Sequence, residues 1–248
     1  GVQIVYKTVP IQLNYIDISQ IDEKNIDKYL IDYLKDERKN PFELDKAPLW
    51  RAALFGHQKN SLFLLQCHHA ILDGWSVASF NTELNNLYLQ LLKNPEVEFL
   101  EKLKCSYKDY IIQSISDSRN QSNKEFWINE LTDYKRLDIF TDIPVQQDLY
   151  KHFNKKYFQT LKNKTKEDSI SIKGLFFGAY LFAMHMLSAE DELTIGLVTN
   201  NRPIAEDGDK VLGCFLNTLP FRYKFDSKEI SWKDFLISIE QKLIELKK

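Results

Sequence analysis

The segment 61–93 constrains the fold more than any other part of the chain. Its apolar run at 62–65 leads to two adjacent histidines, and a short turn at Asp73 and Gly74 follows. An uninterrupted apolar run is expected of a strand covered on both faces. From position 77 to about 93, apolar residues recur at helical spacing. The sequence therefore predicts a strand, a polar turn and a helix in succession, with titratable side chains in the turn.

The rest of the chain predicts a mixture of strands and helices. Residues 2–14 are β-prone, but Pro10 restricts them to a sheet edge or to two short strands. Further strands are expected at 49–56, 61–69, 152–161, 193–199 and 211–225. Helices are expected at 22–39, 77–93, 107–116, 123–134, 171–187 and 230–246. The longest apolar stretch, 174–187, has 14 residues. A membrane helix needs about 20, so we expect a buried core helix and no membrane partner.

Composition disfavours several classes of function. Lys and Arg number 33 against 35 Asp and Glu, so the chain lacks the basic field typical of nucleic-acid binding, and no nucleic-acid partner is expected. Only 8 residues are glycine, and neither G-x-G-x-x-G nor G-x-x-x-x-G-K-[ST] occurs, which disfavours a nucleotide cofactor. The 3 cysteines are widely spaced and odd in number, so neither a disulfide framework nor a C-x-x-C site is expected. This cysteine usage fits a reducing, cytoplasmic location.

One run is dense in reactive groups: residues 68–74, which read H-H-A-I-L-D-G. Neighbouring residues on a strand point to opposite sides, so one of His68 and His69 is expected to face a cavity and the other the scaffold. An imidazole with an ordinary pKa of about 6.5 suits proton transfer, and the carboxylate of Asp73 would orient it or brace the turn. The same residues also fit a hydrogen-bond cluster without chemistry. A metal site is disfavoured because the two histidines diverge and no further ligand is near in sequence.

Other nucleophile arrangements are disfavoured. Cys67 stands beside His68, but neighbouring strand residues diverge, so this cysteine is expected to be a small buried apolar residue. The G-x-S-x-G elbow of serine hydrolases is absent. Arg202 follows an apolar strand. The residues alone leave it open whether this arginine forms a structural ion pair, lies in a solvated loop or has a functional role.

Several segments, taken in order, are similar to the motifs of one family. The run H-H-A-I-L-D-G-W-S at 68–76 resembles the core motif of the condensation domains of nonribosomal peptide synthetases. The other matching segments are P-F-E-L-D at 41–45 with P-L-x-R at 48–51, Y-K-D-Y at 107–110, F-W at 126–127, N-R-P at 201–203 and G-C-F-L-N-T-L-P at 213–220. The element H-x-x-x-D-G alone is shared with chloramphenicol acetyltransferase. The ordered set spans nearly the whole chain and makes the resemblance specific.

The resemblance implies an α/β fold of two lobes in a V arrangement, with the active site in a tunnel between them. Each lobe would be built like chloramphenicol acetyltransferase, as a mixed sheet covered by helices. With Pro144, several aspartates and no periodicity, 135–150 is the expected interlobe linker. Residues 1–134 would form the N-lobe without its first strand and helix, and 151–248 the first half of the C-lobe. The resemblance therefore implies truncation at both ends.

The reaction that the resemblance implies is amide-bond formation. The α-amine of an aminoacyl group on a downstream carrier protein attacks the thioester of an acyl or peptidyl group on an upstream carrier. Each group rides on a 4′-phosphopantetheine arm. His69 would face the tunnel as the catalytic residue, either accepting the amine proton or holding the amine in line. His68, Asp73 and Arg202 would be structural, with Asp73 paired to Arg202. The residues expected to line the tunnel are Gly74, Trp75, Ser76 and Asn217.

The resemblance also implies the partners. Upstream and downstream carrier domains and an adenylation domain in the same polypeptide are expected, as in antibiotic or siderophore biosynthesis, with no metal and no directly bound cofactor. Two alternatives are a stand-alone acyltransferase that uses acyl-coenzyme A and a non-catalytic docking module, which the intact His69 and Asp73 disfavour. Cys214 stands where many members carry Phe, which leaves the donor preference open. The motif lacks the Asp-rich form of heterocyclising relatives, so ring formation is disfavoured.

Overall fold

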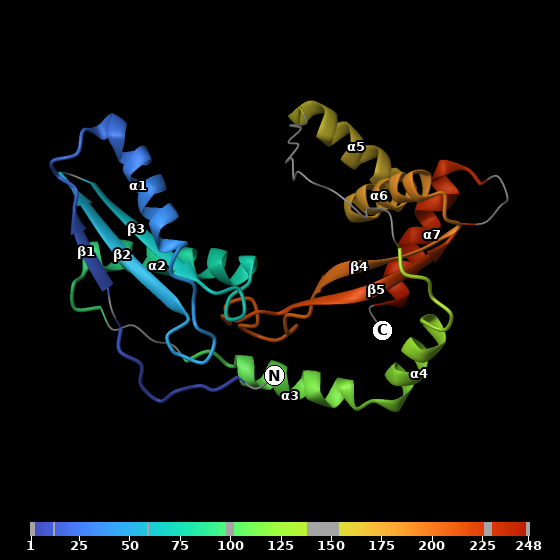
Figure 1. Cartoon of the computed structure of the whole chain (residues 1–248), viewed down its shortest axis with the longest axis horizontal. Helices are drawn as coiled ribbons and strands as arrows, with labels where there is room; N and C mark the ends of the chain where they lie inside the picture. Colours follow the sequence, from blue (N-terminus) through green and yellow to red (C-terminus); the bar gives the residue numbers. More distant parts are fainter. Residues whose placement is uncertain are drawn as a thin grey trace. The chain divides into compact units, whose positions relative to one another are not determined.

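The computed structural model describes residues 3–11, 13–58, 60–97, 102–137, 154–225 and 230–246 (Figure 1). Its contacts divide the chain into two units. The first comprises Gly1–Ile115 and Asn200–Leu216, and the second comprises Ser116–Thr199 and Asn217–Lys248. The segment Asn200–Leu216 therefore groups with the motif-bearing unit rather than with the sequence on either side of it. Most of the expected linker, 138–150, lies outside the described residues, so the division into lobes at 134 and 151 stays a prediction.

The first unit is built on a sheet with the strand order β1-β2-β3. The strands are β1 (Leu13–Asp17), β2 (Trp50–His57) and β3 (Asn60–Cys67). They are followed by helix α2 (Gly74–Lys93) and by α3 (Tyr107–Ser118), which belongs to this unit as far as Ile115. β1 runs parallel to β2, whereas β2 and β3 form an antiparallel hairpin that pairs Trp50 with Cys67. Helix α1 (Glu23–Glu37) packs on β2, where Tyr33 meets the fully buried Phe55 edge-on at 5.1 Å between ring centroids (Figure 1). This packing fixes the hairpin that ends at the histidine motif.

Two expectations about these strands were wrong. Of the segment 2–14, only its last residues belong to a strand, because β1 runs from Leu13 to Asp17 and the residues before it are not paired in the described sheet. β3 is not covered on both faces. It lies at one edge of the described sheet, and Leu62 and Phe63 are 38% and 42% exposed. An apolar run predicts the strand but not its neighbours, because the sheet order decides what covers each face.

The second unit combines helices with a two-stranded sheet of β4 and β5. Its elements are α4 (Gln121–Glu130), α5 (Lys155–Glu167), α6 (Ile172–Ser188), β4 (Glu192–Asn200), β5 (Leu216–Lys224) and α7 (Trp232–Glu245). Four fully buried residues, one each from α6, β4, β5 and α7, form the centre of its core: Leu181, Leu193, Phe221 and Ile239. Residues from four elements therefore close one hydrophobic core.

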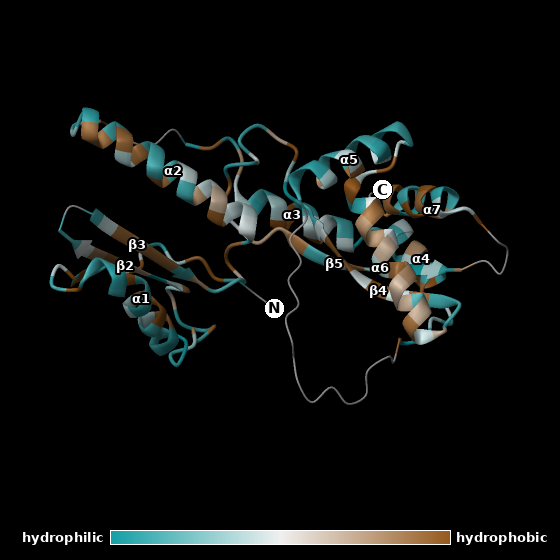
Figure 2. Ribbon diagram, turned by 90° about the horizontal axis from the view of Figure 1, so that it is seen from above, coloured by the Kyte–Doolittle hydropathy of each residue, from teal (hydrophilic) through white to brown (hydrophobic). Residues whose placement is uncertain are grey.

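Helix α6 is buried on one face only, which corrects the expectation of a fully buried core helix. Leu181 is fully buried, whereas Phe176 and Tyr180 are 41% and 50% exposed, and Figure 2 shows apolar colouring along the helix. In the described part of the chain, no single helix is long and apolar enough to cross a membrane. Only α5 and α6 taken together, with a bend of 97° between them, reach the length and composition of a span.

Two further sequence-based elements differ from the structure. The expected strand at 152–161 is a helix from Lys155 onward, because Asn154 caps it by accepting a hydrogen bond from the Lys156 amide at 2.8 Å. Residues 152 and 153 lie outside the described residues. The expected strand at 211–225 is limited to β5, because Gly213 and Phe215 direct backbone groups toward Asp73 and Ser76 instead of a neighbouring strand.

An arginine of β5 holds the end of α4 within the second unit. The Arg222 guanidinium donates from Nη1 to the carbonyls of Glu130 and Thr132 at 2.8 Å and 2.6 Å. Its Nε donates to Glu192 Oε1 at 2.5 Å. Carbonyls at a helix C-terminus lack intrahelical partners, so this side chain satisfies them and ties α4 to the β4–β5 sheet.

Candidate functional site

The histidine motif occupies the turn between β3 and α2. β3 ends at Cys67 and α2 begins at Gly74, so 68–73 form the connection. Asp73 caps α2, because its Oδ1 accepts a hydrogen bond from the Ser76 amide at 2.7 Å. The backbone amide of Asp73 donates to the Gly213 carbonyl at 3.0 Å. The turn is thus fixed both by a helix cap and by a contact with a distant segment of the same unit.

The two histidines have different environments. His68 is half-buried: its Nδ1 accepts a hydrogen bond from the Ala70 amide at 3.1 Å, and its ring meets Phe42 at 90° with 6.3 Å between centroids. His69 is exposed, and within the described residues its side chain makes no hydrogen bond or ion pair. The imidazole of His69 is therefore the one that a ligand reaches from solvent. The expected strand at 61–69 ends earlier, at Cys67, so both histidines lie in the turn and their different environments do not come from strand alternation.

Asp73 and Arg202 form a buried ion pair, as the resemblance implied. Arg202 Nη2 lies 3.1 Å from Asp73 Oδ1, and the two side chains are 9% and 1% exposed. The same nitrogen donates to Ser76 Oγ at 2.8 Å, and Nη1 donates to the carbonyls of Gly208 and Val211. Buried charges need both a partner and satisfied hydrogen bonds. Arg202 has the Asp73 carboxylate as its partner and hydrogen bonds from Nη1 and Nη2, whereas its buried Nε has no hydrogen-bond partner among the described residues. These contacts make it a structural group of the motif.

Ser76 is the second centre of this network. It is fully buried, its hydroxyl donates to the Gly213 carbonyl at 2.7 Å, and the Gly213 amide donates back to Oγ at 3.1 Å. Together with the contact from Arg202, these bonds occupy the hydroxyl inside the protein. This position differs from the expected place in the substrate tunnel. In the described structure, Ser76 joins the first turn of α2 to the segment around Gly213.

The network holds Asp73 ionised. Burial opposes ionisation of its carboxyl group, but the hydrogen bonds from the Ser76 and Phe215 amides and the charge of Arg202 outweigh burial. The result is a pKa of Asp73 below its ordinary value of 3.8. The Arg202 guanidinium also lies over the Phe215 ring, 4.1 Å from its centroid. At neutral pH, the fixed negative charge in the motif turn is therefore paired with the fixed positive charge of Arg202.

Tyr107 and Gly213 have structural roles that the sequence pattern does not indicate. Tyr107, in the Y-K-D-Y segment, donates its hydroxyl hydrogen to the Cys214 carbonyl at 2.9 Å and packs edge-on against Phe215. Gly213 lies against the ring of Tyr107, because a Cβ built on this glycine would be 2.2 Å from Tyr107 Cδ2. A glycine in an apolar run signals a close approach, but only the structure shows which side chain approaches it.

The remaining expected site residues lie in different places. An added Cβ at Gly74 would meet no heavy atom within 4 Å, so the backbone here is open to a ligand. Trp75 is 56% exposed, and its indole Nε1 donates to the Asp209 carbonyl at 3.0 Å. Asn217 is exposed and belongs to the second unit, where its Oδ1 accepts from the Thr218 amide at 2.9 Å. Gly74 and Trp75 therefore adjoin the motif network within the first unit.

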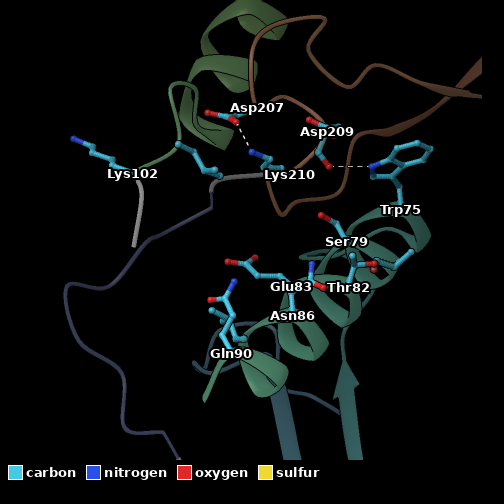
Figure 3. A pocket seen from close by; sticks show the side chains of 13 residues that line it. Trp75, Ser79, Thr82, Glu83, Asn86, Gln90, Lys102, Asp207, Asp209 and Lys210 are labelled. Carbon is cyan, nitrogen blue, oxygen red and sulfur yellow. Dashed lines mark hydrogen bonds and ion pairs between the residues drawn. The ribbon is translucent and has the colours of Figure 1, made fainter. Parts of the chain in front are cut away.

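Two cavities of the first unit include residues next to the motif. One has a volume of about 800 Å³ and is lined by Trp75, by further residues of α2 and by the segments 102–103 and 207–210 (Figure 3). The other has about 900 Å³ and is lined by Ala70 and Ile71 together with residues of 3–9 and 44–50. His69 is in neither lining. Its predicted place in a tunnel is therefore not tested by these two cavities.

The thiol beside the motif is not activated for nucleophilic attack. Cys67 is half-buried, and burial raises the pKa of its thiol, which keeps the sulfur protonated at neutral pH. Among the described residues, no group of three or more His, Cys, Asp or Glu side chains is placed to hold a metal ion. The exposed imidazole and the open backbone at Gly74 are the groups best placed to meet a substrate.

Comparisons with known proteins agree with this arrangement. A family model described as Condensation domain matches residues 1–247. Cyclosporin synthetase simA from Tolypocladium inflatum is 27% identical over 243 residues, which cover 92% of this chain and 2% of that protein. The first condensation domain of the calcium-dependent antibiotic synthetase is 18% identical with a TM-score of 0.71, covering 96% of this chain and 56% of that one.

An epimerization domain from the third module of tyrocidine synthetase B has the same fold. It is 18% identical with a TM-score of 0.76, and the match covers 95% of this chain and 56% of that one. The α/β fold is therefore the one that these solved domains share. The chain spans about 56% of the two solved chains and 2% of the curated relative.

Proposed function

The chain belongs to the condensation domain family, and on that premise we propose that it catalyses amide-bond formation in nonribosomal peptide synthesis. The donor is an acyl or peptidyl thioester on an upstream carrier, and the acceptor is the α-amine of an aminoacyl group on a downstream carrier. The observation that carries the proposal is the exposed imidazole of His69, which lies in a turn fixed by the buried Asp73–Arg202 pair.

The reaction forms one bond and breaks another. The amine nitrogen attacks the thioester carbonyl, the new C–N bond forms, and the C–S bond breaks to release the upstream carrier as its free phosphopantetheine thiol. One proton leaves the amine nitrogen, and one proton reaches the thiolate. His69 either accepts the amine proton or holds the amine in line, since a neutral imidazole has a free acceptor nitrogen. Fixing the two reactants in place removes up to about 7–11 kcal/mol of the barrier.

The motif network supports this role by fixing the position of the turn. Asp73 caps α2 and binds Arg202, and Ser76 ties the same helix turn to Gly213. The open backbone at Gly74 leaves room for the thioester beside the helix N-terminus, where amide groups favour developing negative charge. In this proposal Arg202 is a positioning residue and does not touch the substrate.

The partners follow from the same proposal. Carrier domains deliver both substrates on 4′-phosphopantetheine arms, so the domain needs no cofactor of its own. An adenylation domain of the same polypeptide loads the downstream carrier, and assembly of this kind takes place in the cytoplasm. The match covers only 2% of the curated relative, which is named as a synthetase. This small share supports a condensation domain that works within a much longer polypeptide.

Product analysis tests the proposal. The protein is incubated with two loaded carriers, and the products are released and analysed by mass spectrometry and chiral chromatography. A new amide on the downstream carrier supports condensation. Transfer from acyl-coenzyme A to a soluble amine without carriers would support the acyltransferase alternative, and carrier binding without turnover would support the docking module. Inversion of an α-carbon without a new amide would indicate epimerization, the activity named for one of the matched folds.

A matched pair of variants separates catalysis from folding. His69→Ala removes the imidazole, and Lys24→Ala removes an exposed side chain of α1 in the same unit. We expect His69→Ala to abolish amide formation with an unchanged melting temperature, and Lys24→Ala to leave both unchanged. Undiminished amide formation by the His69→Ala protein would refute the proposed role of the imidazole.

A further inference from the structure

The cavity of about 800 Å³ lies directly beside the motif. Its volume is within the range of about 300–1,000 Å³ that small-molecule sites occupy. One wall is a stripe of α2 that begins at Trp75, the residue after Gly74, and the facing wall consists of the segments 102–103 and 207–210 (Figure 3). All of these residues belong to the first unit. A ligand that fills this cavity therefore extends from the motif along α2.

Four polar side chains form a row along this stripe: Ser79, Glu83, Asn86 and Gln90 (Figure 3). Their positions correspond to i, i+4, i+7 and i+11, which lie on one face of a helix. In the described part of the chain, none of the four side chains makes a hydrogen bond or an ion pair. Their donors and acceptors are therefore available to a ligand, and they come from a rigid element rather than from a loop.

The length of the row fits an extended peptide. Residues 79 to 90 span about 16 Å at about 1.5 Å of rise per helical residue. An extended peptide advances about 3.3 Å per residue, so about five of its residues lie along the row. Hydroxyl and amide side chains match the N–H and C=O groups of such a backbone. An alkyl chain would remove the same side chains from water without giving them partners, which costs free energy.

The charges of the cavity favour a cationic group. Asp207 is paired with Lys210 at 2.8 Å, so these two charges neutralise each other. Three other charged side chains line the cavity, and in the described part of the chain none of them forms an ion pair: Glu83, Asp209 and Lys102. Two unpaired negative charges therefore stand against one unpaired positive charge. The α-ammonium of a peptide is the cation that a peptidyl substrate supplies. Glu83 lies eight helical positions after Trp75, about 12 Å along the axis, which an extended chain of three or four residues covers.

We infer that this cavity binds the acyl part of the substrate as a short, extended peptidyl chain with a free amino terminus, and that Glu83 pairs with that terminus. The inference rests on the proposed function, because the reacting carbonyl must lie at the motif. It names the substrate class that the proposed function leaves open. Unblocked tri- and tetrapeptidyl groups are preferred over N-acylated peptides and over fatty acyl groups of similar length.

Binding without turnover tests the inference. The ¹⁵N-labelled 248-residue chain is titrated with tetra-alanine amide, with its N-acetyl form and with octanamide. The NMR signal of the Trp75 indole N–H, which donates to Asp209 at one end of the cavity, is assigned by its loss in Trp75→Phe. We expect tetra-alanine amide to shift this signal and to bind about two- to fivefold more tightly than the acetylated form, the range of an exposed ion pair. Octanamide should leave the signal unmoved.

Two matched variants identify the carboxylate. Glu83→Gln keeps the size of the side chain and removes its charge, so the two peptides should bind the variant equally. Glu23→Gln makes the same change at an exposed position of α1 and should keep the preference. Equal affinities of the unvaried chain for the two peptides, an unmoved Trp75 signal, or a preference that survives Glu83→Gln would overturn the inference.

The titration is independent of the condensation assay. Peptide binding together with a lack of amide formation would contradict the proposed function and leave the peptide site standing. Amide formation together with an unmoved Trp75 signal would contradict the peptide site and leave the proposed function standing.

Discussion

Replacing Arg202 by Met should unfold the first unit more readily, and the structure sets the size of the effect. The guanidinium is 9% exposed and lies 3.1 Å from a carboxylate that is 1% exposed. At an effective dielectric constant of about 20, two unit charges at this distance attract by about 5 kcal/mol before desolvation is subtracted. Removing one partner of a buried pair costs about 3–5 kcal/mol.

The lower end of that range applies to Arg202→Met. Asp73 keeps its hydrogen bonds from the Ser76 and Phe215 amides after the substitution, so its charge is not left without donors. The carbonyls of Gly208 and Val211 do lose their donor. We therefore expect a loss of about 3 kcal/mol in the free energy of unfolding. This corresponds to about 6–12 °C in melting temperature, at about 2–4 °C per kcal/mol for a chain of this size.

A matched substitution in the same unit provides the control. Arg51 pairs with Glu37 at 3.2 Å, but its side chain is 36% exposed. Partly exposed pairs contribute about 0–1 kcal/mol, so Arg51→Met should cost no more than about 1 kcal/mol. Urea unfolding followed by circular dichroism measures both variants. Equal losses in the two variants would mean that burial of the Asp73–Arg202 pair has no energetic consequence, which contradicts this prediction.

Three further predictions concern the same network and the second unit. The lowered pKa of Asp73 means that its ionisation stabilises the fold fully above pH 3.8 and that this stability is lost as the pH falls below it. The stability advantage over Asp73→Asn should therefore shrink in acid titrations below about pH 4, and an advantage independent of pH would contradict the shift. Gly213→Ala should cost about 1–3 kcal/mol in thermal unfolding, because its Cβ would lie 2.2 Å from Tyr107 Cδ2. Gly74→Ala, whose Cβ would meet nothing within 4 Å, should change stability by less than about 0.5 kcal/mol; equal effects at the two glycines would argue against the Tyr107 contact. Arg222→Met should raise amide hydrogen exchange at the end of α4, because the carbonyl of its last residue, Glu130, and that of Thr132 just beyond it lose their donor, and unchanged exchange there would refute that role.

The sequence predicted the elements around the motif well because local patterns determine them. α2 was expected at 77–93 from helical spacing, and the structure begins it at Gly74 because Asp73 caps it. The hairpin of β2 and β3 also follows two apolar runs separated by a turn. These features need no contact between distant segments.

The errors arise where capping or distant contacts override the local pattern. The aromatic residues of 152–161 are β-prone, but the Asn154 cap and the apolar spacing on the following turns produce α5. The segment 211–215 is apolar, yet its backbone bonds to Asp73 and Ser76 across more than 130 positions of sequence. The burial of Ser76 depends on that same contact. No window of the sequence contains both sides of this network.

The single-turnover rate of amide formation by His69→Gln tests whether the imidazole takes part in the reaction. Glutamine keeps a polar side chain at this exposed position of the turn between β3 and α2, but it does not accept a proton at neutral pH. With both carriers loaded and mixed rapidly with the protein, we expect the rate to fall about 10²- to 10⁴-fold if the imidazole transfers the proton. A smaller loss that matches the loss in His69→Ala would assign it to positioning. A rate equal to that of the unvaried protein in both variants would contradict the account.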